Sequence, residues 1–187
     1  RGRPVIGIVV CWSGHLPDGR AALAPFLKAH PPAVDLVHPM PYTALQQLLD
    51  PPNMPGLRNY WTADFFETLP DTAVDVLVRL ASRPASPLTQ VILMPGGGAL
   101  SRIPEDETAF SRRDAPFSIH YLGMWADPAD DALNTASIRQ LSAVMKPWTT
   151  GTVYVNFIGD EGMARLETGY GPARFSRLRG SNRAGTP

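Results

Sequence analysis

The sequence has little cysteine, no excess of either charge and no long apolar run, and each shortage excludes a class of protein. Cys11 is the single cysteine, so neither an internal disulfide nor a Cys-x-x-Cys zinc site can form, which favours a reducing, cytoplasmic compartment. The 17 basic and 17 acidic residues balance to a formal charge of +0, which gives no general attraction to nucleic acid or anionic lipid. No apolar run approaches the ~20 residues that a bilayer span needs. We therefore expect neither a nucleic-acid partner nor a membrane partner.

Glycine and proline, by contrast, are abundant. The 187 residues include 16 glycines and 20 prolines, so we expect short elements joined by turn-rich connections. The chain opens at Arg1 without a Met or a signal-like segment and enters an apolar run at once. This beginning is typical of a piece cut from a longer protein.

Short β-branched and apolar runs predict strands, and segments with a period near 3.6 predict helices. The strands are expected at residues 5–12, 88–94, 118–125 and 152–158, with 57–66 extended at its start. The helices are expected at residues 20–29, 43–49, 71–81, 127–146 and 170–178. Strands and helices joined by such unequal connections indicate an α+β fold, in which helices pack on one face of an antiparallel sheet. Residues 1–178 are expected to form one domain, and residues 179–187 to be a disordered tail.

Alternation along two of these strands places polar side chains on one face. In 152–158, Val153, Val155 and Phe157 are expected in the core, with Tyr154 and Asn156 on the other side. In 118–125, His120 belongs to the polar set. If both polar sides face the same way, the three polar residues line a surface that the helices leave open, and the sequence predicts a site there. The simpler alternative is a solvated sheet face without a function.

The remaining polar segments favour structural interpretations. Gly96–Gly98 lack the pattern of a phosphate-binding loop and predict a bend or a close backbone approach. Arg112, Arg113 and Asp114 predict a solvated turn with a local ion pair, and residues 105–107 an exposed acidic loop. His15, His30 and His38 lie at irregular spacing in turns, so no metal site is assigned to them.

Several segments, taken in order, resemble a known family. The run TVYVNFIGDEG at 152–162, followed by Tyr170-Gly171-Pro172, is similar to the C-terminal signature of FAD-linked oxidases of the berberine bridge enzyme type. Other matching runs are PMPYTALQQLL at 39–49, NYWTADF at 59–65, PLTQVILMPGGG at 87–98 and AFSRRDAPF at 109–117. Together they cover nearly the whole chain to about Leu178.

The resemblance implies the substrate-binding portion of a flavoprotein oxidase, with FAD held mainly by a domain absent from this chain. The implied partners are that FAD-binding domain and a small-molecule substrate, an alcohol or amine that is oxidised by hydride transfer with dioxygen as acceptor. By this resemblance, His120 and Tyr154 look like residues at catalytic positions of the family, and Asn156 is similar to an Asn beside the flavin. Trp61 and Met124 are candidates for the wall of the substrate pocket, or belong to the ordinary core.

The pKa values of the two side chains favour His120 as the base. A tyrosine ionises near ~10 and would need a pKa lower by ~3 units at neutral pH, whereas a histidine ionises near ~6.5. We therefore expect His120 to take the substrate proton and Tyr154 to hydrogen-bond the substrate.

Three departures from the family pattern support an alternative, a non-catalytic α+β binding or remnant domain that has lost its flavin half. The residues that attach the flavin covalently are missing, and Arg112 stands where the family usually has His. The family segment that follows position 178 is replaced by RGSNRAGTP.

Overall fold

A computed structural model describes residues 4–184. Their contacts divide the chain into two compact units, residues 1–54 and residues 55–187. The sequence predicts one domain over residues 1–178, and this remains a prediction. The two units are described separately below.

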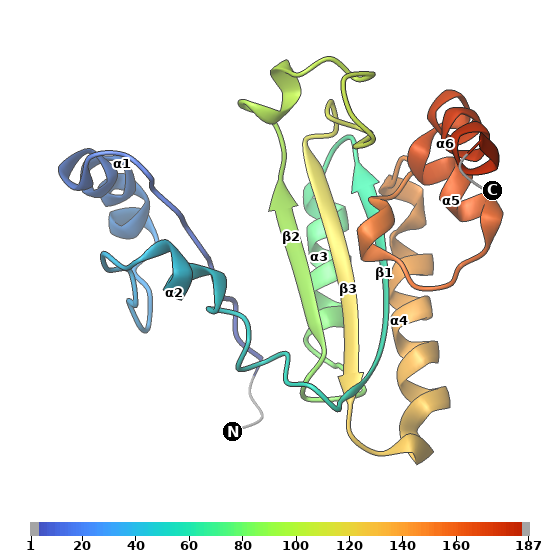
Figure 1. The fold of residues 1–187 in the computed structure, drawn as a ribbon. Helices are drawn as coiled ribbons and strands as arrows, with labels where there is room; N and C mark the ends of the chain where they lie inside the picture. The colour runs from blue at the N-terminus through green and yellow to red at the C-terminus, as the bar shows by residue number, and fades with distance from the viewer. Residues whose placement is uncertain (1–3, 185–187) are drawn as a thin grey trace. The chain divides into compact units, whose positions relative to one another are not determined.

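The first unit contains the helices α1, Leu16–Ala29, and α2, Tyr42–Gln46 (Figure 1). The strand expected at residues 5–12 is wrong, because these residues form no ladder and Val5 is 88% exposed. Helix α1 begins four residues earlier than expected and keeps Pro25 in its interior. Among the described residues of this unit, Gly19 is the only buried one, so the unit encloses no apolar core of its own.

The second unit is built on three strands: β1, Arg58–Phe66; β2, Gln90–Pro95; and β3, Phe117–Trp125. Their order in the sheet is β1-β3-β2, and β3 pairs antiparallel with both neighbours (Figure 1). Two of the strands lie within one or two residues of the expected bounds. The three-stranded antiparallel sheet confirms the α+β class.

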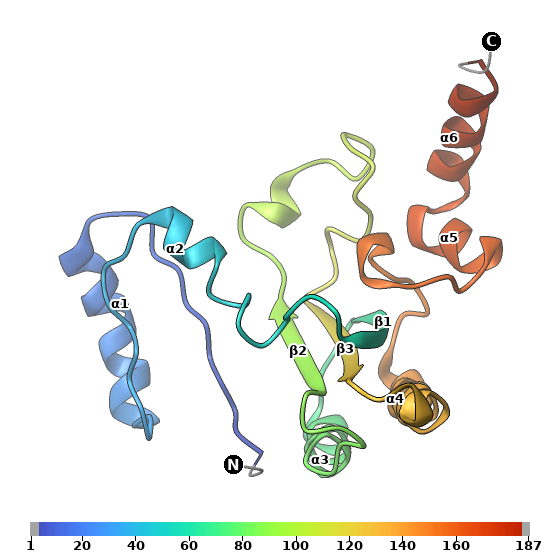
Figure 2. The ribbon, with the colours of Figure 1, turned by 60° about the horizontal axis from the view of Figure 1, so that its bottom comes forward.

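Helices α3, Asp71–Ala81, and α4, Asp131–Met145, cover one face of this sheet (Figure 2). The expected bounds of α3 are confirmed, whereas the segment capped by Asp127 begins with a 3-10 turn, Pro128–Asp130, before α4. Every second residue of β3 packs against the helices. Burial of a Leu, Ile, Phe or Met side chain contributes about 1.5–3 kcal/mol to the free energy of folding. The residues of this core are Phe66, Ala73, Ile119, Tyr121, Ile138, Leu141 and Met145.

The segment after α4 lies against the opposite face of the sheet instead of extending it. Residues 152–158, expected as a strand, contain a 3-10 helix, Val155–Phe157, and form no ladder. Only the start of the segment pairs with β1, where Thr150 N–H donates to Phe65 O at 2.8 Å and Phe65 N–H to Thr152 O at 3.2 Å. Val153 and Ile158 then pack on Ala63. The expected strand does not form, because the chain turns into the 3-10 helix before further backbone hydrogen bonds to β1 can follow.

The glycine run after β2 makes the bend that the sequence predicts. Gly96 N–H donates to Pro116 O at 2.7 Å, and a Cβ at Gly96 would lie 2.3 Å from Ala115 O. Gly97 has φ of 101°, in the left-handed region that glycine tolerates. The chain then forms a 3-10 turn, Leu100–Arg102, and a long loop before β3.

Two helices follow the 3-10 segment: α5, Met163–Tyr170, and α6, Pro172–Ala184 (Figure 2). The single helix expected at residues 170–178 is wrong, since Gly171, with φ of 80°, separates the two helices. Helix α6 also continues six residues past Leu178, where the sequence predicts disorder. Its arginines favour a helix, although Ser181 is a weaker helix former and Gly180 costs about 1 kcal/mol. Residues 185–187 of the expected tail lie outside the described residues.

Candidate functional site

The predicted site residues of the sheet lie on the face turned away from α3 and α4. In the register of β1 and β3, His120 is opposite Ala63, and Trp61 is opposite Leu122. Side chains that face each other across a ladder share a side of the sheet. Since Ile119 and Tyr121 belong to the helix-covered core, His120 and Trp61 must point the other way.

Five rings join this face of the sheet to the segment that lies on it, and we call them the aromatic row: Trp61, His120, Phe157, Tyr154 and Phe110. The imidazole of His120 stacks on Phe157, with centroids 4.5 Å apart and planes 3° from parallel, and Trp61 meets its edge at 6.1 Å. Tyr154 contacts Phe157 at 4.8 Å and Phe110 at 5.0 Å. One continuous set of contacts therefore links His120 to Tyr154.

His120 is more enclosed than the sequence predicts. Only 9% of the residue is exposed, and its Nε2 atom is buried without a hydrogen-bond partner among the described residues. Burial lowers the pKa of His120 below its ordinary value of 6.5, because the charged imidazolium would lose its hydration. At neutral pH the ring is therefore uncharged and has a free ring nitrogen.

Tyr154 and Asn156 lie on the 3-10 segment, where they hydrogen-bond to each other. The Nδ2 group of Asn156 donates to the hydroxyl of Tyr154 at 2.8 Å. Asn156 is exposed and Tyr154 half-buried. The two residues thus share a surface as the sequence predicts, although a turn produces this and not a strand. Phe157, expected in the core beside Val153 and Val155, separates Tyr154 from His120.

Met124 lies on the same side of β3 as His120, four residues further along. At about 3.3 Å per residue it is roughly 13 Å from His120, beyond direct contact. It is 4% exposed. The structure therefore gathers Trp61, His120, Tyr154 and Asn156, and leaves Met124 outside the group.

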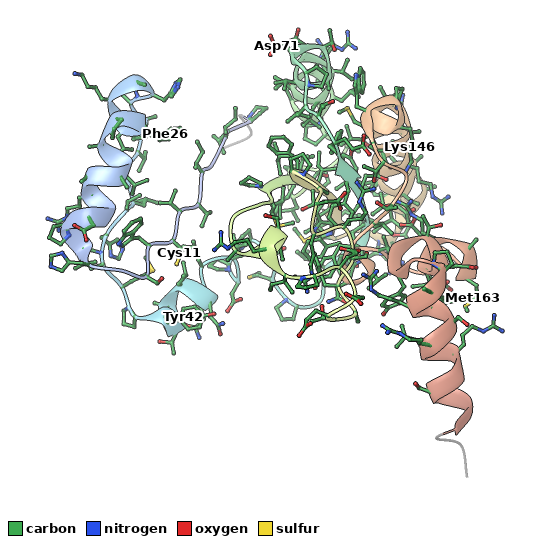
Figure 3. The ribbon with its side chains drawn as sticks, turned by 90° about the horizontal axis from the view of Figure 1, so that it is seen from above. Cys11, Phe26, Tyr42, Asp71, Lys146 and Met163 are labelled. Carbon is green, nitrogen blue, oxygen red and sulfur yellow. The ribbon has the colours of Figure 1, made fainter. Side chains whose placement is uncertain are left out.

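A buried ion cluster without a signal in the sequence lies on the helix-covered face of the sheet, opposite the face that carries His120, because Asp64 pairs with Ile119 in the ladder. The carboxylate of Asp64 on β1 is fully buried. It accepts hydrogen bonds from Lys146 Nζ at 2.6 Å, from Arg165 Nη2 at 2.9 Å and from the hydroxyl of Ser142 at 3.1 Å. Figure 3 marks Lys146 at the end of α4. Burial, and then the negative charge of Asp64, raise the pKa of the Tyr121 phenol, which therefore stays protonated.

Arg165 of α5 extends the cluster to the segment that carries Tyr154. Its guanidinium donates to the carbonyls of Gly151 and Ala63, each at 2.8 Å, and pairs with Glu161 at 3.4 Å. One side chain thus binds both ends of residues 151–161 and the backbone of β1. The position of Tyr154 relative to the sheet depends on these contacts.

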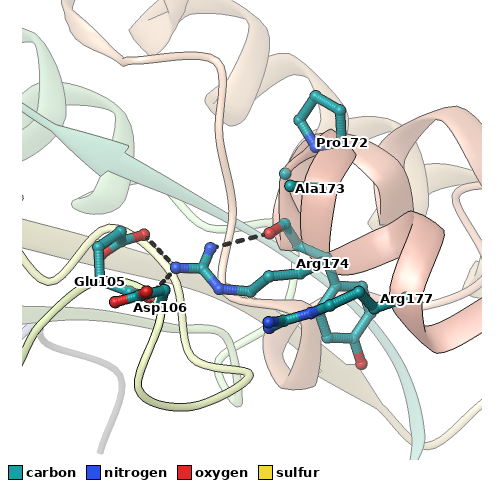
Figure 4. Close-up of a pocket in the computed structure, with 8 residues that line it drawn as sticks. Glu105, Asp106, Pro172, Ala173, Arg174 and Arg177 are labelled. Atoms are coloured by element: carbon teal, nitrogen blue, oxygen red, sulfur yellow. Dashed lines mark hydrogen bonds and ion pairs between the residues drawn. The ribbon is translucent and has the colours of Figure 1, made fainter.

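An open cleft of about 400 Å³ lies elsewhere, between the loop of Glu105 and Asp106 and the start of α6 (Figure 4). Arg174 crosses it, pairing with Glu105 at 2.9 Å and donating to Tyr170 O at 3.0 Å. The cleft contains none of the predicted site residues. Of its charged side chains, Arg174 and Glu105 pair with each other.

Residues 4–184 contain neither a metal-binding cluster nor a helix that could span a membrane. No group of three or more His, Cys, Asp or Glu there could hold a metal ion. No helix within the same range is both long and apolar enough to cross a bilayer.

Comparisons with known proteins agree with the resemblance found in the sequence. An uncharacterized FAD-linked oxidoreductase of Bacillus subtilis, YvdP, is 27% identical over 165 residues, covering 84% of this chain and 36% of that protein. Berberine bridge enzyme-like 27 of Arabidopsis thaliana is 34% identical over 104 residues, which are 50% of this chain and 19% of the plant protein. A scan against protein-family models gave no match.

Solved structures show the same fold. Aclacinomycin oxidoreductase superposes with a TM-score of 0.69 at 20% identity, over 89% of this chain and 39% of that one. For the BBE-like 1 protein of Physcomitrella patens the TM-score is 0.60 at 19% identity, over 68% and 28% of the two chains. This chain thus spans only about a third of the length of most of these relatives. In sequence and in fold, it is related to a portion of the FAD-linked oxidoreductases of the berberine bridge enzyme-like type.

Proposed function

We propose that this chain is the C-terminal, substrate-binding portion of an FAD-dependent oxidase that acts on a small organic alcohol or amine. The flavin would be held mainly by a separate domain, in the same chain or in another. One observation carries the proposal: His120, Tyr154 and Asn156 gather on the sheet face that α3 and α4 leave free. Residues 1–178 would then be the part of the enzyme that supplies this face.

The residues present fit a flavin on this face. The aromatic row offers ring surfaces for a planar heterocycle, and the buried Nε2 of His120 has no partner among the described residues. Asn156 is exposed and has an amide suited to the polar edge of such a ring. When bound, the flavin would accept a hydride from the substrate and pass the electrons to dioxygen, giving hydrogen peroxide.

His120 would act as the base in this reaction. Its lowered pKa keeps the imidazole unprotonated at neutral pH, so it can accept the proton of a substrate hydroxyl or amine. Tyr154 would hydrogen-bond the substrate and help to orient it, while Asn156 donates to the phenol oxygen. Trp61 would wall the pocket on the side of β1, whereas Met124, buried and out of contact with His120, would belong to the ordinary core.

The test pairs this chain with the FAD-binding domain of a full-length relative and follows flavin reduction by stopped-flow absorbance. We expect His120→Ala and Tyr154→Phe each to slow reduction by about 10²-fold or more, since a positioned base contributes that much. The exposed His38→Ala is the matched control and should leave the rate unchanged. Unchanged rates in both site variants would remove the assignment, and absence of bound flavin would favour the non-catalytic alternative.

A further inference from the structure

Arg113 is a buried cation without an acidic partner, a feature that the proposed function leaves unexplained. The residue is 6% exposed, and no carboxylate among residues 4–184 lies within 4 Å of its guanidinium. The sequence predicts a solvated turn here, so this expectation is wrong for Arg113. It is confirmed for Arg112, which pairs with Asp114 at 2.9 Å and with Glu67 at 3.7 Å.

The contacts of Arg113 compensate its charge only in part. Nη2 donates to the neutral hydroxyl of Thr108, Nε is buried without a partner in the described structure, and the guanidinium carbon lies 5.1 Å from the centroid of Phe110. A buried guanidinium normally has a carboxylate or phosphate across its fork of donors, because burying an unpaired charge is costly. The guanidinium of Arg113 therefore has room in its hydrogen bonding for one anion, which the described residues do not supply.

The nearest acid, Glu105, does not supply this anion. Its carboxylate accepts the backbone N–H groups of Arg112 at 3.0 Å and Arg113 at 3.3 Å, and it pairs with Arg174 at 2.9 Å. Glu105 thus holds the backbone of the turn, in which Arg112 has the strained φ of 59°. A turn fixed in this way places the Arg113 side chain against Phe110 and away from solvent.

Phe110 connects Arg113 to the candidate site. This ring is the end of the aromatic row, 5.0 Å from Tyr154. Because Phe110 contacts both the guanidinium and the phenol, the two groups suit a small molecule that carries an anionic group and a group to be held by Tyr154.

We propose that Arg113 is an oxyanion-binding residue, which takes a carboxylate or phosphate group of a small molecule bound along the aromatic row. The source of this anion depends on the proposed function, in which it belongs to the substrate or to the cofactor. Binding of the anion itself depends on Arg113 alone, since two parallel N–H donors of a guanidinium match two oxygens of either group.

The experiment is an NMR titration of the isotope-labelled chain, without flavin or turnover. Sodium benzoate, inorganic phosphate and FAD are added separately, each against sodium chloride of the same ionic strength to remove screening effects. We expect saturable shifts of the Arg113 Nε–Hε signal and of the Phe110 ring, and a melting temperature that rises with the bound anion. Shifts with benzoate assign the anion to the substrate, and shifts with phosphate and FAD alone assign it to the cofactor.

Variants at neighbouring arginines separate a binding role from a structural one. Arg113→Met removes the buried charge and should abolish both the shifts and the rise in melting temperature, while the control Arg112→Met keeps them. Arg113→Lys retains the charge without the fork and should weaken binding by about 10-fold, which keeps the test valid if the Met variant does not fold. Absence of a saturable shift with every anion, or equal shifts in wild type and Arg113→Met, would overturn the proposal. Neither result bears on flavin reduction, which tests the proposed function separately.

Discussion

Replacing Asp64 by Asn should strongly destabilise the second unit while leaving its shape unchanged. The substitution removes the charge that Lys146 and Arg165 share, at 2.6 and 2.9 Å, and keeps almost the same volume. Breaking a buried ion pair from one side costs about 3–5 kcal/mol. The lower end, about 3 kcal/mol, is expected here because the side chain of Lys146 is 44% exposed and regains water, whereas that of Arg165 is 15% exposed and does not.

Urea unfolding followed by circular dichroism measures this loss. With a slope of about 2 kcal/mol per molar urea, the midpoint should fall by about 1.5 M. The control is Asp160→Asn on the exposed loop after the 3-10 segment, which should change stability by less than about 0.5 kcal/mol. A midpoint for Asp64→Asn that moves no further than that of the control would show that the cluster adds nothing to stability, and the reasoning would fail.

Two further results are expected. Burial lowers the pKa of His120 in the folded chain below its ordinary value of 6.5. As the pH falls below 6.5, the unfolded chain therefore binds a proton at this residue more readily than the folded chain does, and the free energy of unfolding decreases. His120→Phe, which keeps a ring on Phe157, should therefore flatten the fall of the unfolding free energy on acidification, and an unchanged slope would contradict the burial effect. Gly169→Ala should cost about 1–3 kcal/mol in the same urea assay, since the new Cβ would lie 2.6 Å from a methyl of Val155. Gly180→Ala, with open space around it, should instead add about 1 kcal/mol to α6, and equal effects of the two would refute the close contact at Gly169.

Elements with local signals were predictable from the sequence. Helix α3 has apolar residues at helical spacing, and β3 is a short segment rich in apolar and aromatic residues. These patterns arise from burial on one side, so a short segment carries them without knowledge of its partners. Helix α4 buries Ile138, Leu141 and Met145 at helical spacing for the same reason.

The errors concern segments whose conformation depends on distant contacts. Residues 152–158 alternate as a strand does, yet alternation cannot supply the neighbouring strand that a ladder requires. Residues 5–12 have strand composition and likewise no pairing partner. Helix α5 begins after Gly162, with φ of 84° and no side-chain cap, so no start signal marks it.

The candidate site was predictable as a set of residues but not as an arrangement. Alternation in the expected strands grouped His120 with Tyr154 and Asn156, and the resemblance added their implied roles; the structure places His120 on the face turned away from α3 and α4. The stacking of Phe157 on His120 requires the 3-10 turn, which the sequence does not indicate. The burial of Arg113 could not be predicted either. Arg112 and Arg113 are adjacent in the same turn, and the sequence does not indicate which of the two side chains is buried.

The bond from Arg165 to the carbonyl of Ala63 affects how such a site can change. Ala63 is the ladder partner of His120. Arg165 of α5, which also holds the segment that carries Tyr154, therefore binds the backbone of β1 directly beside His120. The spacing of imidazole and phenol is consequently set by main-chain geometry. Side chains around them can be exchanged through evolution, altering which molecules fit, while the two reactive groups keep their separation.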